Sequence, residues 1–140
     1  MRILVVDDEP HNRMLLQHML KSFGECDLAV DGREAVEAFI MAFDDQRPYD
    51  LVLLDIMMPE MNGQDALKSI RAYEQEKGVA GGSEAVVFMV SALDTETQVV
   101  EAFFKGHCTD YITKPINRDL LFAKLREYGK RLHLDQDNPS

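Results

Sequence analysis

The sequence predicts an α/β fold, a three-layer doubly wound (βα)5 sandwich with a parallel five-stranded sheet between two layers of helices. Five short apolar runs rich in β-branched residues recur along the chain, and such runs are typical of strands. Amphipathic segments with helical spacing separate the runs. Repeated alternation of strand and helix requires right-handed crossovers, which cover both faces of a parallel sheet with helices.

The predicted strands differ in their hydrophobic pattern. The third and fourth runs are apolar without interruption, whereas a strand with one face in water would alternate. We therefore expect these two strands near the centre of the sheet. The five predicted strands span residues 3–6, 26–30, 51–54, 86–90 and 111–113.

The first predicted helix begins at Pro10 and ends at Gly24. Proline is favoured in the first turn of a helix, and glycine is common just beyond the last turn. Four apolar residues of this segment are expected to be buried against the sheet. They are Met14, Leu15, Met19 and Phe23.

The other helices are marked by polar residues at their predicted N-termini, which can accept hydrogen bonds from the first turn. These residues are Asp31, with Glu34 completing a capping box, Asn62, Thr95 and Asn117. The second helix is expected over residues 32–43, and the fourth is expected to end at Gly106. The apolar residues expected to be buried are Ala35, Val36, Phe39, Ile40 and Phe43 on the second helix, Leu67, Ile70 and Tyr73 on the third, Val99, Val100 and Phe103 on the fourth, and Leu121, Leu125, Tyr128 and Leu132 on the fifth.

The composition excludes several classes of function. The chain of 140 residues carries 25 acidic and 15 basic residues, a formal charge of −10, and it has no basic run that would bind nucleic acid. The longest apolar run, residues 85–90, is far shorter than the ~20 residues that span a bilayer. No secretory signal opens the chain. We therefore expect a soluble, cytoplasmic protein that contacts neither nucleic acid nor membrane.

The predicted domain organisation is simple. Residues 1–132 are expected to form one domain, and residues 133–140 a polar, frayed tail. Cys26 and Cys108 belong to no CxxC motif or Cys/His cluster, which disfavours a thiolate metal site or a redox pair. The acidic excess, which includes Glu74, is expected to form a solvated face.

Polar side chains follow four of the five predicted strands. They are Asp7 and Asp8 after the first strand, Asp55 after the third, Ser91 after the fourth and Lys114 after the fifth. Ligands of open parallel sheets bind in the crevice beyond the carboxyl ends of the strands. We therefore expect these side chains to form one site.

The residue types at these strand ends suit phosphoryl transfer. Three neighbouring carboxylates repel one another, and a proton or a cation must relieve the repulsion. Hard oxygen ligands open to solvent favour Mg²⁺, which commonly bridges protein carboxylates to a phosphate. A lysine ammonium and a serine hydroxyl suit phosphate oxygens, and a carboxylate can itself attack phosphorus to form an acyl phosphate.

Four motifs contain these residues, in one order along residues 2–132. They are Asp7-Asp8-Glu9, Asp55-Ile56-Met57-Met58-Pro59-Glu60-Met61-Asn62-Gly63, Ser91-Ala92 and Tyr111-Ile112-Thr113-Lys114-Pro115. Their order and spacing resemble the receiver domain of two-component response regulators, and the resemblance covers nearly the whole chain. It implies the flavodoxin-like strand order 2-1-3-4-5.

The resemblance also implies a role for individual residues. Asp55 would be the phosphoacceptor, which takes a phosphoryl group from a sensor histidine kinase or a histidine phosphotransfer protein. Asp8 and Asp55 would bind Mg²⁺ directly, Asp7 largely through water, and Met57 would contribute its backbone carbonyl. Lys114 would pair with the phosphate, and the peptide bond that follows it would be cis.

A conformational switch is implied as well. Ser91 would move toward the phosphate together with residues 92–94, and Tyr111 would turn into the space that this leaves. The output surface would be the fourth helix, the fifth strand and the fifth helix, which would act on a separate effector protein. A homodimer through charge pairs on this surface is a further expectation, with Lys105, Asp110, Arg118 and Arg126 at the corresponding positions.

Two apolar residues bear on how long the phosphoryl group would persist. Met57 and Leu93 stand at the two positions that modulate dephosphorylation in this family, and neither can orient water, so we expect a phosphoryl lifetime that is not especially short.

The main alternative function is an aspartyl-nucleophile phosphohydrolase. Such an enzyme usually has a second Asp where Met57 stands. A flavin carrier would need a hydroxyl-rich phosphate loop in place of Asp7-Asp8-Glu9.

Overall fold

The five strands form one parallel sheet in the order β2-β1-β3-β4-β5. The computed structural model describes residues 1–56, 61–79, 81–91 and 108–134. The predicted fold class and strand order are confirmed. The strands are β1 (Arg2–Val6), β2 (Glu25–Ala29), β3 (Leu51–Asp55), β4 (Val86–Ser91) and β5 (Asp110–Thr113).

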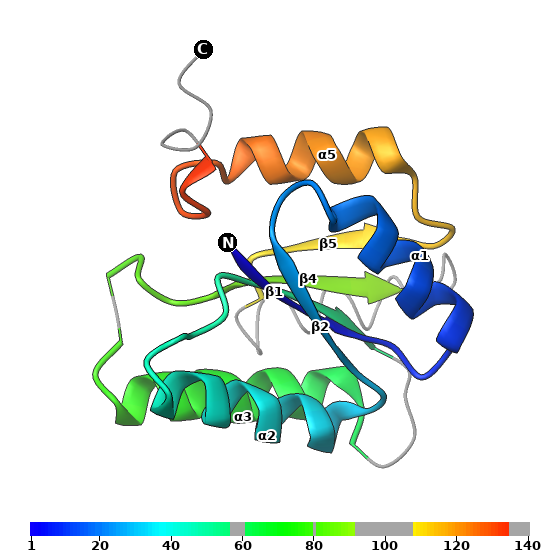
Figure 1. Ribbon diagram of the computed structural model, residues 1–140. Coiled ribbons are helices and arrows are strands. Elements are labelled where there is room, and N and C mark those ends of the chain that lie inside the picture. The colour runs from blue at the N-terminus through cyan, green and yellow to red at the C-terminus, as the bar shows by residue number, and fades with distance from the viewer. Residues whose placement is uncertain (57–60, 80, 92–107, 135–140) are drawn as a thin grey trace.

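Helices cover both faces of the sheet (Figure 1). On one face lie α1 (Pro10–Leu20) and α5 (Arg118–Glu127), and on the other lie α2 (Gly32–Asp44) and α3 (Gly63–Glu76). The helix predicted between Thr95 and Gly106 lies outside the described residues. The part of the chain that the structure describes contains no helix long and apolar enough to cross a membrane.

The core is divided by the sheet into two clusters. Val52 and Leu54 of β3 join the cluster beneath α2 and α3, whereas Leu51 and Leu53 join the one beneath α1 and α5. Every residue of β3 and β4 is buried, because both strands are covered on both faces. Their uninterrupted apolar runs therefore reflect the inner position that the sequence predicts.

Three predicted helix starts are confirmed by their caps. The side-chain oxygens of Asp31, Asn62 and Asn117 accept the backbone N–H of the third residue after each, at 2.8, 2.9 and 3.0 Å. Each such bond satisfies one of the N–H groups that a first helical turn leaves unpaired. These caps place the first turns of α2, α3 and α5 close to the carboxyl ends of the strands.

The predicted buried face of α1 is wrong in part. Met14 is 67% exposed and Leu15 is 39% exposed, whereas Leu16 and Leu20 are buried. At about 100° per residue, Met14 lies on the opposite side of the helix from Leu16. The sheet therefore selects the face that carries Leu16 and Leu20, with Met19 and Phe23 partly buried beside it.

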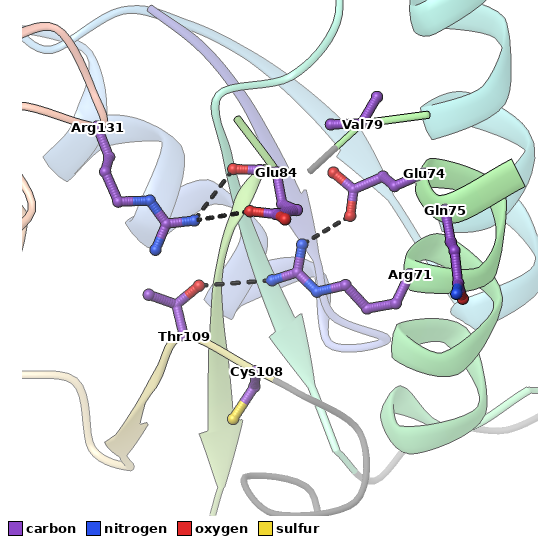
Figure 2. A pocket seen from close by; sticks show the side chains of 8 residues that line it. All are labelled: Arg71, Glu74, Gln75, Val79, Glu84, Cys108, Thr109 and Arg131. Atoms are coloured by element: carbon purple, nitrogen blue, oxygen red, sulfur yellow. Dashed lines mark hydrogen bonds and ion pairs between the residues drawn. The ribbon is translucent and has the colours of Figure 1, made fainter. Parts of the chain in front are cut away.

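The expectation that Glu74 is solvated is also wrong, because its exposed fraction is 3%. Figure 2 shows Glu74 and Arg71 pointing toward one another from α3 in a surface hollow. The Glu74 carboxylate accepts hydrogen bonds from the Arg71 guanidinium at 2.7 Å and from the Ala85 N–H at 2.8 Å. Arg71 also donates to the Ala85 carbonyl at 2.9 Å. This ion pair therefore anchors α3 to the residue that precedes β4.

The two cysteines are free, with Cys108 buried and Cys26 half-buried. Burial is the main cause that raises the pKa of the Cys108 thiol, to about 11. Leu132 is buried, and Leu134 packs against the same core cluster. Residues 135–140 of the predicted tail lie outside the described residues.

Candidate functional site

The register of the sheet brings two of the predicted acidic residues together. β1 and β3 are hydrogen-bonded neighbours with Val6 opposite Leu54. The next residues along the chain are Asp7 and Asp55, so these two lie side by side where the strands end. We call this side of the sheet, formed by the C-terminal ends of its strands, the carboxyl edge, and the opposite side the amino edge. This confirms that strand ends far apart in sequence meet at one place, as expected for a parallel sheet.

Three carboxylates form a single cluster. One oxygen from each of Asp7, Asp8 and Asp55 lies within 4.8 Å of the others. Asp7 and Asp55 are buried, with exposed fractions of 1% and 3%, whereas Asp8 is exposed. The cluster therefore has two buried acids at its base and one acid that faces solvent.

Lys114, the residue directly after β5, brings a positive charge to this cluster. Its Nζ lies 3.2 Å from Asp55 Oδ2 and 3.5 Å from Asp7 Oδ2. Burial alone lowers the pKa of the Lys114 ammonium, but the carboxylates of Asp55 and Asp7 outweigh burial, and the pKa is raised above its ordinary value. The ammonium is therefore charged at neutral pH. The peptide bond from Lys114 to Pro115 is cis, as the resemblance implies.

Two buried oxygens at this edge have no hydrogen-bond partner among the described residues. They are Asp7 Oδ2, which meets Lys114 only at ion-pair distance, and Ser91 Oγ. Ser91 is 1% exposed, and a buried polar oxygen without a partner is unfavourable unless a ligand or an ion satisfies it. Carboxylate oxygens are the ligands that Mg²⁺ prefers. The residues present therefore fit a hydrated Mg²⁺ ion beside a phosphoryl group.

Tyr111 lies on β5, three residues before Lys114, which directly follows this strand. Its Cα pairs with Met89, two residues before Ser91 on β4. The Tyr111 ring is 44% exposed, and Lys124 Nζ lies 5.8 Å from its centroid. The roles of Ser91 and Tyr111 as a switch stay predictions.

Other predicted site residues lie outside the described residues, namely Met57, Leu93 and Lys105. Of the residues expected at a dimer surface, Asp110 is engaged within the chain. It pairs with Lys124 at 3.1 Å and accepts a hydrogen bond from the Tyr128 hydroxyl at 2.9 Å. The homodimer stays a prediction.

Gly63 packs against the end of β3 in a way that the motif alone did not explain. A Cβ atom at this position would lie 2.2 Å from the Asp55 carbonyl oxygen, which is a severe clash. The Gly63 N–H donates to the Ile56 carbonyl at 2.9 Å. Only glycine therefore allows the start of α3 to pack directly against the backbone of Asp55.

Arg13 is a site residue that the sequence reasoning missed. Its Nη1 donates to the Asp7 backbone carbonyl at 2.6 Å. The signal that could have found it is its place near the start of α1, where the helix dipole disfavours a cation. A basic residue at such a position needs a compensating contact, and the acidic turn directly before the helix provides one.

Comparison with known proteins agrees with this geometry. The family model described as the response regulator receiver domain matches residues 3–126. Chemotaxis protein CheY of Thermotoga maritima is 34% identical over 131 residues, which cover 92% of this chain and 98% of CheY. Sensor protein GacS of Pseudomonas syringae pv. syringae is 34% identical over 132 residues, which cover 94% of this chain but 14% of GacS. The chain therefore spans a small part of that longer relative.

A solved structure supports the same assignment. The receiver domain of the Saccharomyces cerevisiae response regulator Ssk1, solved with the phosphotransfer protein Ypd1, matches with a TM-score of 0.78 and 26% identity. The match covers 92% of this chain and 88% of the solved one. With the family model matched over residues 3–126 and CheY covered almost end to end, the chain belongs to the response regulator receiver domain family.

Proposed function

We propose that this receiver domain is a phosphorylation-dependent switch of a two-component system, with Asp55 as its phosphoacceptor. The observation that carries the proposal is the cluster of Asp7, Asp8 and Asp55, within 4.8 Å of one another, with the Lys114 ammonium 3.2 Å from Asp55. Its chemistry suits a carboxylate nucleophile that receives a charged phosphoryl group.

The donor in this proposal is a phosphohistidine of a sensor kinase or a histidine phosphotransfer protein. A carboxylate oxygen of Asp55 forms a bond to phosphorus while the P–N bond of the phosphohistidine breaks. The electron pair of that bond returns to the imidazole, and the product is an acyl phosphate on Asp55. The Ssk1 receiver has been solved together with a histidine phosphotransfer protein, which supports a donor of this kind.

Residues around Asp55 neutralise and orient the transferred group. Lys114 pairs with a phosphate oxygen, because its ammonium already lies against the acceptor carboxylate. Ser91 donates its hydroxyl, which has no hydrogen-bond partner among the described residues, to another phosphate oxygen. Both contacts stabilise negative charge that develops in phosphoryl transfer.

Mg²⁺ is the cofactor that this donor set fits. Asp8 and Asp55 would ligate the ion directly, Asp7 largely through water, and the backbone carbonyl of Met57 would complete the set contributed by the protein. When bound, the ion neutralises the carboxylates and the phosphate. The three acids are thereby spared the mutual repulsion that they have without a cation.

The output in this proposal is a conformational change rather than the turnover of a substrate. Attraction of the Ser91 hydroxyl by phosphate shifts the balance between an inactive and an active form. Tyr111 then turns inward, and the surface formed by the fourth helix, β5 and α5 changes its affinity for an effector protein. The partners are a histidine kinase or phosphotransfer protein upstream and that effector downstream, in the cytoplasm.

The test uses acetyl phosphate as donor and intact mass as readout. We expect one phosphoryl group to be added to the wild-type protein with Mg²⁺, and none without it. Asp55→Asn should gain none, because its amide cannot attack phosphorus. Asp45→Asn, which changes an exposed acid at the end of α2, is the matched control and should be modified like the wild type.

Two results would contradict the proposal. Addition of phosphate to Asp55→Asn at the wild-type rate would place the acceptor elsewhere. Repeated hydrolysis of ordinary phosphomonoesters by the wild-type protein, lost in Asp55→Asn, would instead support the aspartyl phosphohydrolase.

A further inference from the structure

Arg13 connects α1 to the turn that carries the acidic residues. Its guanidinium donates to the Asp7 carbonyl at 2.6 Å, and its backbone N–H donates to the Glu9 carbonyl at 3.1 Å. The Glu9 N–H in turn donates to Asp7 Oδ1 at 2.8 Å. Three hydrogen bonds therefore hold residues 7–9 between the end of β1 and the first turn of α1.

This turn determines where Asp8 lies. The Asp7 carbonyl belongs to the peptide unit that leads into Asp8, so a fixed carbonyl fixes the plane of that unit. Asp7 is also held by its own N–H, which donates to the Ala29 carbonyl at 3.2 Å. Asp8 is exposed and makes no hydrogen bond or ion pair with another described residue. Its direction therefore depends on its backbone, and among the described residues two side chains constrain this backbone, Asp7 through the Glu9 N–H and Arg13 through the Asp7 carbonyl.

We propose that Arg13 is a positioning residue, which holds the Asp7 carbonyl so that the exposed Asp8 carboxylate faces the Mg²⁺ ion. The inference rests on the proposed function, because it assigns a metal-positioning role at that same site. Groups that orient the ligands of a metal from outside its coordination shell typically change its affinity about 10-fold to 100-fold when they are removed.

The sign of the effect separates positioning from simple electrostatics. A guanidinium close to a cation site repels the cation, so loss of its charge alone would tighten Mg²⁺ binding. Loss of its hydrogen bond frees the turn that carries Asp8, which weakens Mg²⁺ binding. Positioning and charge therefore predict opposite changes in the same dissociation constant.

The experiment measures the Mg²⁺ dissociation constant of the whole chain by isothermal titration calorimetry. We expect Arg13→Met, which keeps the length of the stem but removes every donor, to bind Mg²⁺ about 10-fold more weakly. Arg13→Lys keeps the charge and one donor group, and its Mg²⁺ dissociation constant should lie between those of the wild type and Arg13→Met. Arg33→Met removes an exposed cation from the first turn of α2 and should bind Mg²⁺ like the wild type.

A second measurement separates positioning from general damage to the fold. The loss of phosphorylation by acetyl phosphate in Arg13→Met should be largest at low Mg²⁺ and should diminish as Mg²⁺ approaches saturation, because a higher concentration compensates for a weaker affinity. Unchanged or tighter Mg²⁺ binding in Arg13→Met would overturn the positioning role and leave the proposed function intact. Absence of Mg²⁺ binding in the wild type would overturn both.

Discussion

The two ends of the sheet each bury a cluster of charged side chains, but the clusters differ in how well their polar atoms are satisfied. At the amino edge, Glu74 accepts hydrogen bonds from Arg71 and from the Ala85 N–H, at 2.7 and 2.8 Å (Figure 2). At the carboxyl edge, Asp7 and Asp55 share one ammonium, from Lys114. There, Asp7 Oδ2 and Ser91 Oγ have no hydrogen-bond partner among the described residues.

We infer from this difference that the first cluster is structural and the second is functional. A buried ion pair whose oxygens and donors are satisfied fixes the position of the elements that it joins. A buried cluster that leaves oxygens without a protein partner can accept a ligand, an ion or water at those oxygens. Substitutions in the cluster at the amino edge should therefore lower the stability of the protein. Substitutions of the acids at the carboxyl edge should instead impair its function and can raise its stability.

The largest expected effect follows from breaking the satisfied cluster. Glu74→Ala removes the buried carboxylate that pairs with the Arg71 guanidinium at 2.7 Å and accepts the Ala85 N–H at 2.8 Å, and we expect a loss of about 3–5 kcal/mol of unfolding free energy. Urea unfolding would measure it. Glu76→Ala, at an exposed position on the same helix, should change the free energy by less than about 0.5 kcal/mol. Equal losses in both variants would show that the buried pair has no special role.

Added Mg²⁺ should distinguish the two clusters, because it should raise the unfolding free energy through the acids at the carboxyl edge alone. At a free concentration about 100 times its dissociation constant, the ion should raise the unfolding free energy by about 2.7 kcal/mol. The gain should persist in Glu74→Ala, because distant sites contribute independently. It should disappear in Asp8→Asn. A gain that depends on Glu74 rather than on Asp8 would contradict the separation of the two ends.

A smaller effect of opposite sign is expected when Asp7 is neutralised. Asp7→Asn removes a buried negative charge that repels Asp55 and lacks a hydrogen bond on Oδ2, and an Asn oxygen can still accept from the Glu9 N–H. Without Mg²⁺, we expect a gain on the order of 1 kcal/mol in unfolding free energy. Urea unfolding at low ionic strength would detect it. Destabilisation would show that the ion pair with Lys114 outweighs the repulsion.

The smallest effect concerns alkaline pH. The pKa of Lys114 is raised above its ordinary 10.5 in the folded protein, so the folded state holds this proton more tightly than the unfolded state. The resulting stability is fully present below pH 10.5 and is lost as the pH rises through the folded pKa. Lys114→Met should therefore lose less stability than the wild type over this range. Equal losses would mean that other groups account for the alkaline change.

Much of the carboxyl edge could be predicted from sequence, because strand-end residues of a parallel sheet meet wherever the strands are correctly assigned. The caps at Asp31, Asn62 and Asn117 were predictable for a different, local reason, since each depends on residues within one helical turn. The family assignment is confirmed by the match over residues 3–126. The catalytic and switch roles of Asp55, Lys114, Ser91 and Tyr111 stay predictions that the experiments above test.

The amino edge could not be predicted, because the burial of Glu74 depends on how α3 packs against the residue before β4 and not on a pattern of residues within the helix. Glu74 resembles any acid on a solvated helix until α3 packs beside Ala85, which places a backbone N–H within 2.8 Å. Met14 and Leu15 are as apolar as Leu16, and only the contact of α1 with the sheet decides which of them is buried. Arg13 likewise acquires its contact only when the end of β1 and the start of α1 take up their folded geometry.

By itself, the sequence determined the order of strands and helices, their caps and the acids that end the strands, because local periodicity and hydrogen bonds within a turn specify these features. The tertiary structure alone decided which polar groups are satisfied. That property depends on distances of a few ångströms between atoms from different elements, and burial makes each satisfied or unsatisfied atom energetically significant. The cluster around Glu74 therefore joins α3 to the start of β4 through satisfied hydrogen bonds, while we propose that a cation and a phosphoryl group satisfy the oxygens left at the carboxyl edge.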